Sequence, residues 1–368
     1  MAILGFAGRI ALGIGCAAAL VFALPHARDS GVILAAQGDP AALSDSQLRT
    51  VARPQAADVR REIDTALAAG DTDLAASFVE LANALDIAVP DNITARVNAA
   101  VADSQTSGHV ASQFASGFIT GQVTDVASFS GTVAGDLFVF GDIRDVVREG
   151  KHLATGEEVD RFVLGLACVG LAVTAGTYAS IGIATPARAG LTLVKDARRA
   201  GRLSAGLGAW AGKSAATLVD RPLLEKAVAE ASLAQPAQTV RAIKAAVKFD
   251  RAGEMVAVAK DVGRVGEKAG ARAALDVLKV AEGPEDVARA ARLAAAKGGQ
   301  TRAIIKILGR GALVLASGAF SLASWIFAAL CALFGFVSSI KSMTERLSLA
   351  YFRRRRLRRE RLRTLAVA

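Results

Sequence analysis

The sequence of 368 residues has little of the material that builds metal sites or disulfide frameworks. It contains three Cys and three His, and only 21% of its residues are charged. Aromatic residues contribute 5%, whereas hydrophobic residues make up 52% and the mean hydropathy is +0.38. This composition excludes a disordered chain, which would be polar and highly charged, and a small disulfide-stapled domain. It favours a membrane-associated protein of closely packed helices.

The charged residues are unevenly distributed along the chain. Residues 25–160 carry a net charge of −11, residues 186–310 carry +11, and the C-terminal segment 341–368 carries +8. An acidic front half and a basic back half, with an apolar segment between them, predict different surroundings for the two halves.

One predicted transmembrane helix covers residues 162–185, a run that contains no charged side chain. At about 1.5 Å per residue such a helix crosses a hydrocarbon core of roughly 30 Å. Small residues recur on one of its faces, among them Ala172, Gly176 and Ser180. Small side chains let helices approach closely in a membrane, so we expect this face to pack against another helix or a second copy of the chain. The general abundance of Gly and Ala explains the same pattern without helix pairing.

The second predicted transmembrane helix covers residues 311–340, which also contain no charged side chain. This run is long enough to span with tilt, but too short for two full crossings. Gly311, Gly318 and Gly335 interrupt it, so a kinked or re-entrant arrangement is an alternative.

The N-terminus, residues 1–27, is signal-like. Arg9 precedes an apolar run at 10–24 that has the length of a signal-peptide core. A weak cleavage site at 21–23 predicts a removed signal peptide, and an uncleaved signal anchor is the alternative.

The parts between the apolar runs divide into three regions before residue 162. Residues 28–54 are polar, with Gly and Pro, and predict a linker. Residues 55–110 form an acidic helical domain, in which Gly70 and Asp71 end one helix and cap the next to give an αα-hairpin. Residues 111–161 are a Gly-rich region followed by an acidic loop; the Gly-rich part either enters the membrane or packs on the surface.

The region 186–310 is basic, Ala-rich and helical in its periodicity, and no alternating strand pattern of useful length occurs in the sequence. The fold class is therefore predicted to be all-α. The helices of this region are expected to be soluble, followed by the membrane helix at 311–340 and a polybasic tail at 341–368.

A short segment resembles a known family. The residues Gly141-Asp142-Ile143-Arg144-Asp145, Gly150-Lys151-His152, Thr155-Gly156-Glu157 and Arg161 look like the Thr-Gly-containing pre-toxin segment found upstream of toxin domains in bacterial polymorphic toxins. The similar part covers about residues 141–161. It departs from the pattern at 138–140, where a proline is usual, and at His152, where an acid is usual. The resemblance implies delivery or membrane passage rather than catalysis; a generic loop before a membrane helix explains the same residues.

The polybasic tail carries a cluster of arginines that we interpret as lipid-headgroup contacts. Cations next to a membrane helix bind anionic lipid and hold their end of the helix in the cytoplasm. Nucleic acid is the less favoured partner, because Tyr351 and Phe352 precede the cluster instead of interleaving it. The arginines are Arg353, Arg354, Arg355, Arg356, Arg358 and Arg359.

No set of residues in the sequence converges on a nucleophile, a metal or a phosphate, so we expect no enzyme, no cofactor and no metal site. The sequence predicts a multi-pass protein of the bacterial inner membrane that acts as a scaffold or binds partners. The alternative is a toxin-like effector or its delivery module. The charge of the tail after residue 341 predicts that it is cytoplasmic. A signal-like start followed by spans at 162–185 and 311–340 would place this tail outside the cytoplasm. We give the tail charges more weight than the number of crossings, which requires that residues 117–139 also cross, that 311–340 is re-entrant, or that the N-terminal segment does not translocate the domain.

Overall fold

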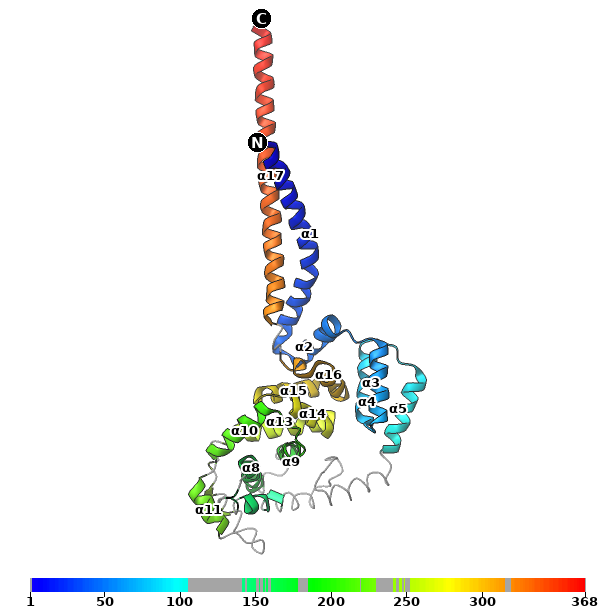
Figure 1. Cartoon of the computed structure of the whole chain (residues 1–368), viewed down its shortest axis with the longest axis vertical. Coiled ribbons are helices and arrows are strands. Elements are labelled where there is room, and N and C mark those ends of the chain that lie inside the picture. Colours follow the sequence, from blue (N-terminus) through cyan, green and yellow to red (C-terminus); the bar gives the residue numbers. More distant parts are fainter. Residues whose placement is uncertain are drawn as a thin grey trace. The chain divides into compact units, whose positions relative to one another are not determined.

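The computed structural model of this chain is helical, and no strand occurs in the residues it describes, as the all-α prediction requires. The chain folds as two compact units, residues 1–38 with 315–368, and residues 39–314 (Figure 1). The structure describes residues 2–104, 141–142, 144–149, 152, 155, 157, 160–177, 185–218, 220–229, 241–242, 245–246, 248, 252–314 and 319–367.

The first unit is a hairpin of two long antiparallel helices. α1 spans Ala2–Ala35 and continues into the short 3-10 helix η1, Ala36–Gly38. Its partner α17 spans Ala319–Val367, and Figure 1 shows the two helices side by side. We refer to this pair as the α1/α17 hairpin.

The second unit, which we call the body, contains the other helices. They are α2 Pro40–Gln47, η2 Leu48–Ala52, α3 Ala56–Ala68, α4 Thr72–Ala84, α5 Asp91–Ser104, α8 Arg161–Thr177, α9 Thr185–Arg199, α10 Ala205–Leu218, α11 Arg221–Ala229, α13 Gly253–Ala269, α14 Ala271–Val280, α15 Pro284–Lys297, η4 Gly298–Gln300, α16 Thr301–Leu308 and η5 Gly309–Ala312.

The predicted αα-hairpin in the acidic region is confirmed as α3 and α4. Gly70 adopts φ of +67°, a left-handed conformation that glycine reaches without a steric penalty, and it lies just after α3. Asp71 is the N-cap of α4 and accepts a hydrogen bond from the backbone N–H of Leu74 at 3.2 Å. Ile63 and Phe78 are fully buried between these helices and the rest of the core. The local sequence therefore determines this part of the fold.

The prediction of a linker at 28–54 is wrong. Residues up to Ala35 continue α1, and α2 follows with Asp39 as its N-cap and Pro40 at its first position. Leu43 and Leu48 are completely buried in the body. The polar composition of this segment concealed helices that pack through Leu43 and Leu48, while Val51 stays exposed.

Arg302 of α16 joins the acidic helices to the C-terminal half of the body. Its guanidinium donates to both carboxylate oxygens of Asp71, at 2.6 and 2.9 Å, and its Nε donates to Asp276 of α14 at 2.9 Å. Only 5% of Arg302 is exposed. The paired guanidinium lowers the pKa of the Asp71 carboxyl although partial burial acts to raise it. One residue thus links segments that are far apart in the sequence.

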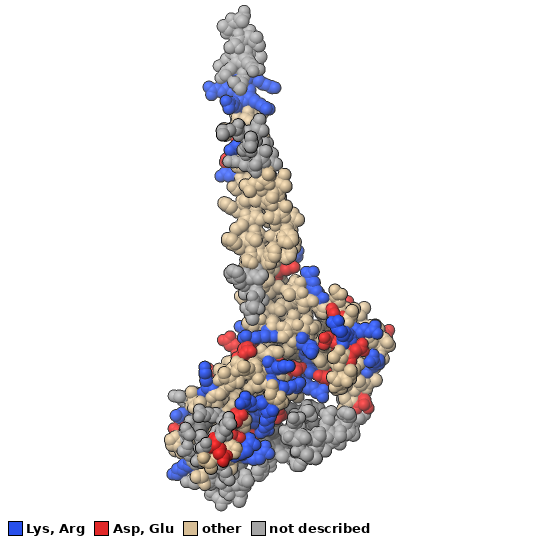
Figure 2. Space-filling view, viewed as in Figure 1, with Lys and Arg blue, Asp and Glu red and all other residues tan. Residues whose placement is uncertain are grey.

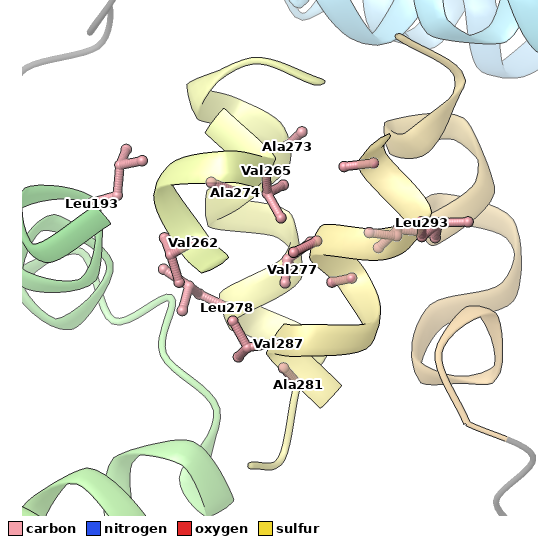
Figure 3. Packing of buried hydrophobic residues seen from close by; sticks show 14 of the residues in the cluster. Leu193, Val262, Val265, Ala273, Ala274, Val277, Leu278, Ala281, Val287 and Leu293 are labelled. Atoms are coloured by element: carbon pink, nitrogen blue, oxygen red, sulfur yellow. The ribbon is translucent and has the colours of Figure 1, made fainter. Parts of the chain in front are cut away.

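The core of the basic region is built from α9, α13, α14 and α15, and a glycine permits the closest approach. A Cβ added to Gly263 of α13 would lie 1.8 Å from the backbone oxygen of Pro186 in α9, so only glycine fits. Figure 3 shows the resulting cluster of small and β-branched side chains, including Val262 and Val265 of α13, Val277 of α14 and Val287 of α15.

The predicted transmembrane helix at 162–185 is described only in part. The helix found there is α8, Arg161–Thr177, and residues 178–184 of the predicted span lie outside the described residues. Every residue from 162 to 170 is buried in the body. Gly165 packs directly on Ala215 of α10, where an added Cβ would lie 2.2 Å from the alanine Cβ. Burial in protein thus accounts for the uncharged sequence of the first half of the predicted span, as burial in lipid would.

The other membrane predictions change in their boundaries. Residues 309–313 belong to the body, and the long helix α17 begins at Ala319 instead of residue 311. At the N-terminus, α1 passes the predicted signal boundary at residue 27 and continues to Ala35. The tail after residue 341 is helical and continuous with α17. The Gly-rich part of region 111–161, up to residue 140, lies outside the described residues.

Candidate functional site

The α1/α17 hairpin exposes an apolar surface. Two helices of the described chain are long and apolar enough to cross a membrane, at Ala11–Gly38 and Leu322–Arg356. Among the residues whose exposure the structure describes, all but two of the exposed large hydrophobic side chains belong to this hairpin, the exceptions being Val51 and Leu223 of the body. Figure 2 shows a broad uncharged surface along the hairpin, with basic residues toward the end of α17. The exposed side chains on the two helices are Leu12, Ile14, Val21, Phe22, Leu24, Val32, Phe327, Leu330, Leu333, Phe334, Val337, Ile340, Met343, Leu347, Leu349, Tyr351 and Phe352.

Small residues line the contact between the two helices. A Cβ added to Gly13 would lie 2.8 Å from the Ser339 Oγ, and one added to Gly335 would lie 2.8 Å from the Cys16 Sγ. Ala329 of α17 is buried. Helices in lipid associate through the close packing of small residues, because an apolar side chain gains little free energy when it moves from lipid into a helix–helix contact. The two helices therefore approach closely through small residues, as helix pairs in membranes do and as α9 and α13 do in the body.

An aromatic cluster packs the helices together nearer the start of α17. The His26 ring stacks on Trp325, with ring centroids 4.6 Å apart, and its Nδ1 lies 2.9 Å from the backbone oxygen of Phe22. Phe22 also contacts Trp325 at 5.8 Å between centroids. Trp is enriched at the boundary between hydrocarbon and headgroups, because its ring is apolar and its N–H is polar. Lys341 and Arg346 mark the opposite end of the apolar part of α17.

The arginines predicted to contact lipid headgroups all lie on α17 with exposed side chains. The helix rises about 18 Å along its axis between Lys341 and Arg353. No Pro or Gly occurs in α17 after Gly335, so the sequence has no helix breaker between the apolar part and the arginines.

A second cluster of charged residues is buried in the body, where the segment that resembles the pre-toxin family meets α9. Asp142 and Asp145 both accept hydrogen bonds from the Lys195 ammonium, and the bond to Asp145 is 3.1 Å long. Arg199 also donates to Asp145 at 3.1 Å. Asp145 is 1% exposed and Lys195 is 7% exposed. Two carboxylates and two cations thus neutralise one another inside the body.

Burial shifts the pKa values of this cluster. Removal from water raises the pKa of Asp142 to about 6, although the neighbouring Lys195 ammonium acts in the opposite direction. The Cys168 thiol of α8 has a pKa raised to about 12 by the same burial and by the nearby Asp142 carboxylate. Asp196, adjacent to Lys195 in sequence, has a pKa raised to about 6, and its Oδ2 is buried without a hydrogen-bond partner in the described part of the chain. A thiol with a raised pKa is a poor nucleophile at neutral pH.

The cluster holds the start of α8. An added Cβ on Gly170 would lie 2.0 Å from the Asp142 Oδ2, so this carboxylate packs directly on the α8 backbone. Asp160 precedes α8, and its Oδ1 accepts from the N–H groups of Phe162 and Val163 at 3.1 and 3.2 Å. Glu149 in turn accepts from the Asp160 N–H at 2.9 Å. These acids therefore have a structural role, which is to position α8.

The sequence alone predicted neither the contact between α1 and α17 nor the cluster of buried ion pairs in the body. The predicted packing residues Ala172 and Gly176 belong to the α8 backbone but their side chains are not described, and Ser180 lies outside the described residues. A small-residue contact that the sequence analysis did not predict occurs between α1 and α17, where Gly13 and Cys16 are spaced for one helix face. The buried ion pairs had a signal in the acids at 142, 145 and 149, which share a helical face, and the cations at 195 and 199, which share another.

Among the described residues, no group of three or more His, Cys, Asp or Glu side chains is arranged to hold a metal ion. Comparison with known proteins gives no relative: no family model, no curated protein and no solved structure matches this chain.

Proposed function

We propose that this chain is an integral protein of a bacterial inner membrane, anchored by the α1/α17 hairpin. The observation that carries the proposal is the outward-facing apolar surface of both helices, with side chains as exposed as Val21 at 76% and Phe334 at 77%. Each large apolar side chain left in water forgoes about 1.5–3 kcal/mol of burial. A hydrocarbon core removes this cost, and the small-residue contact keeps the two helices paired inside it.

The order of the helices along the chain supports a simple topology. Residues 39–314 connect the end of α1 to the beginning of α17. If each helix crosses once, both chain ends lie on one side of the membrane and the body lies on the other. Arg9 and the ten Lys and Arg side chains after position 340 favour the cytoplasm for the chain ends. The body is then outside the cytoplasm. This topology takes α8, whose residues 162–170 are buried in the body, as a helix that does not cross, which would remove the conflict in the sequence-based topology.

The biochemical role that we propose is that of a scaffold that binds a partner, without catalysis. The buried charged residues of the body support it, because Asp142, Asp145, Lys195 and Arg199 contact one another and position α8. Anionic lipid headgroups are the expected partners of Lys341 and Arg346, which lie nearest the apolar part of α17. A second copy of the chain stays a candidate partner for the outer face of the hairpin.

A toxin-like effector is the second candidate function. The residues that resemble a pre-toxin segment are the ones that form the buried ion pairs, so this segment has a defined structural task in the body. Controlled expression in a sensitive bacterium separates the two roles. Growth inhibition that a neighbouring gene product relieves would favour the effector, whereas normal growth supports the scaffold.

Membrane anchorage is tested by carbonate extraction of a bacterial membrane fraction. The full chain should stay in the pellet, and a variant with charges on the outer face, Leu330→Lys with Phe334→Lys, should be inserted poorly because each lysine costs about 2.5–3.5 kcal/mol at the centre of a span. The matched control places the lysines in the body at Val51 and Leu223, which are exposed there. Release of the wild-type chain into the supernatant would refute anchorage.

Orientation is tested separately by labelling single cysteines in intact cells with a thiol reagent that does not cross the inner membrane. The three native cysteines are replaced by alanine, and one cysteine is introduced either at Gly201, in a turn of the body, or at Arg358 of the tail. We expect labelling at 201 in intact cells and labelling at 358 only after the inner membrane is opened. The reverse pattern would show the tail outside the cytoplasm.

A further inference from the structure

The arginines of α17 form a dense column of positive charge. Every position from Arg353 to Arg359 except Leu357 is an arginine, and the side chains of all these arginines are exposed. At about 1.5 Å per residue the helix carries about one charge for every 1.7 Å of its axis, which is close to the spacing of phosphate charges along duplex DNA. Since consecutive residues are turned by about 100°, the six guanidiniums surround the helix instead of occupying one face.

This arrangement differs from that of a helix lying on a lipid surface. An interfacial helix needs an apolar face to enter the headgroup region and a basic face to meet the lipid phosphates. Arginines on all sides leave no such face between 353 and 359. A column surrounded by charge is suited to a partner that presents phosphates on more than one side, as the two backbones of a nucleic-acid groove do.

The unbroken helix also places the arginines away from the bilayer. This step rests on the proposed membrane anchorage, with the hydrocarbon boundary at Lys341, where the charges of α17 begin. Arg353 then lies about 18 Å and Arg359 about 27 Å beyond that boundary along the helix. Headgroups extend the bilayer by only about 5–8 Å on each side, and exposed charges are screened beyond a Debye length of about 8 Å in physiological salt. Most of the column is therefore out of reach of the lipid phosphates.

We propose that the arginine column of α17 binds the phosphate backbone of nucleic acid on the cytoplasmic side of the membrane, without reading its sequence. Guanidinium groups bind phosphate with paired hydrogen bonds and keep their charge at any physiological pH. Tyr351 and Phe352 precede the column and do not alternate with it, so base stacking has no part in the interaction.

The test uses the full chain in nanodiscs of neutral phosphatidylcholine and a fluorescent 30-base-pair DNA duplex. Neutralising about six phosphates predicts a slope of roughly −5 when the logarithm of the binding constant is plotted against that of the salt concentration. Binding should accordingly weaken about 10³-fold between about 50 and 200 mM KCl. A variant with the six arginines changed to Gln should lose this binding, and one with six Lys should retain most of it, because the charge is kept.

Two controls decide between partners. Three body arginines that are also exposed, Arg60, Arg61 and Arg96, are changed to Gln and should leave duplex binding unchanged. The measurement is repeated in nanodiscs that contain anionic phosphatidylglycerol. Unchanged duplex binding supports the column standing away from the bilayer; a loss of at least tenfold would show that lipid occupies the arginines and would overturn the proposal. Equal duplex binding by wild type and the six-Gln variant would overturn it as well. Carbonate extraction is independent of these results, so failure here is distinguishable from failure of membrane anchorage.

Discussion

The pairing of α1 with α17 is open to a direct chemical test at Gly335. A cysteine at this position would place its Cβ 3.9 Å from the Cβ of the native Cys16. Natural disulfides have Cβ–Cβ separations of about 3.5–4.5 Å, so the bond can form with only a small shift of the Cys16 side chain. We predict that Gly335→Cys forms an intramolecular disulfide between two positions that lie at opposite ends of the sequence.

The assay uses full-length protein in native membranes, with Cys168 and Cys331 changed to Ala so that only the designed pair remains. A specific protease site is inserted after Gly201, in the exposed turn between α9 and α10. After mild oxidation and cleavage, the two fragments should stay joined on a non-reducing gel and separate when reduced. A disulfide between two copies of the chain would run at twice the mass before cleavage and is thereby distinguished.

The matched control moves the cysteine to Val337, which is 55% exposed. Two residues along a helix turn the side chain by about 200°, onto the face opposite the contact. This variant should not cross-link to Cys16. Equal cross-linking by both variants, or none by Gly335→Cys in protein with a folded body, would refute the helix pairing described here.

Three further predictions concern the body, measured as the free energy of unfolding of the detergent-solubilised chain. Replacing the buried Arg302 by Leu should cost about 3 kcal/mol, because it removes the buried guanidinium that pairs with both Asp71 and Asp276. Arg61→Leu at an exposed pair should change stability by less than about 1 kcal/mol; equal effects would contradict this. Asp142 has a raised pKa, so the folded state binds its proton more tightly than the unfolded state, and this group lowers stability as pH rises from about 4 to 6. Asp142→Asn should therefore stabilise the body relative to wild type at pH 8 and lose that advantage at pH 4; an advantage that grows on acidification would show the opposite linkage. Gly263→Ala should destabilise by about 1–3 kcal/mol through overpacking, while Gly212→Ala, which meets no neighbour, should stabilise by up to about 1 kcal/mol; a stabilising Gly263→Ala would show that α9 and α13 separate freely.

The sequence predicts the features that depend on neighbouring residues. The α3–α4 hairpin follows from Gly70 and Asp71, since a left-handed glycine and an N-cap act within one helical turn. The all-α class follows from the periodicity of the apolar residues and from the absence of a useful strand pattern.

Features that depend on distant residues were not predictable in the same way. Hydropathy cannot distinguish a helix buried in protein from one buried in lipid. The uncharged sequence of α8 fits either environment, and its residues 162–170 are buried in the body. The partner of α1 begins at Ala319, so no local pattern indicates it. The ion pairs of Lys195 with Asp142 and Asp145 join segments that are distant in the sequence. Considered alone, each of these charged residues looks like an ordinary solvated side chain.

The position of the body between the two hairpin helices in the sequence has a consequence for how the protein is made. α1 leaves the ribosome before α17, and the whole body is synthesised between the last residue of α1, Ala35, and the first residue of α17, Ala319. At about 5–20 residues per second, α1 waits roughly 15–60 s for its partner. In the proposed membrane anchorage, Gly13 and Cys16 face lipid during that interval, which small uncharged residues tolerate without an unsatisfied polar group. α1 would then hold the nascent chain at the membrane as a lone helix, and the hairpin would close only after α17 has been made.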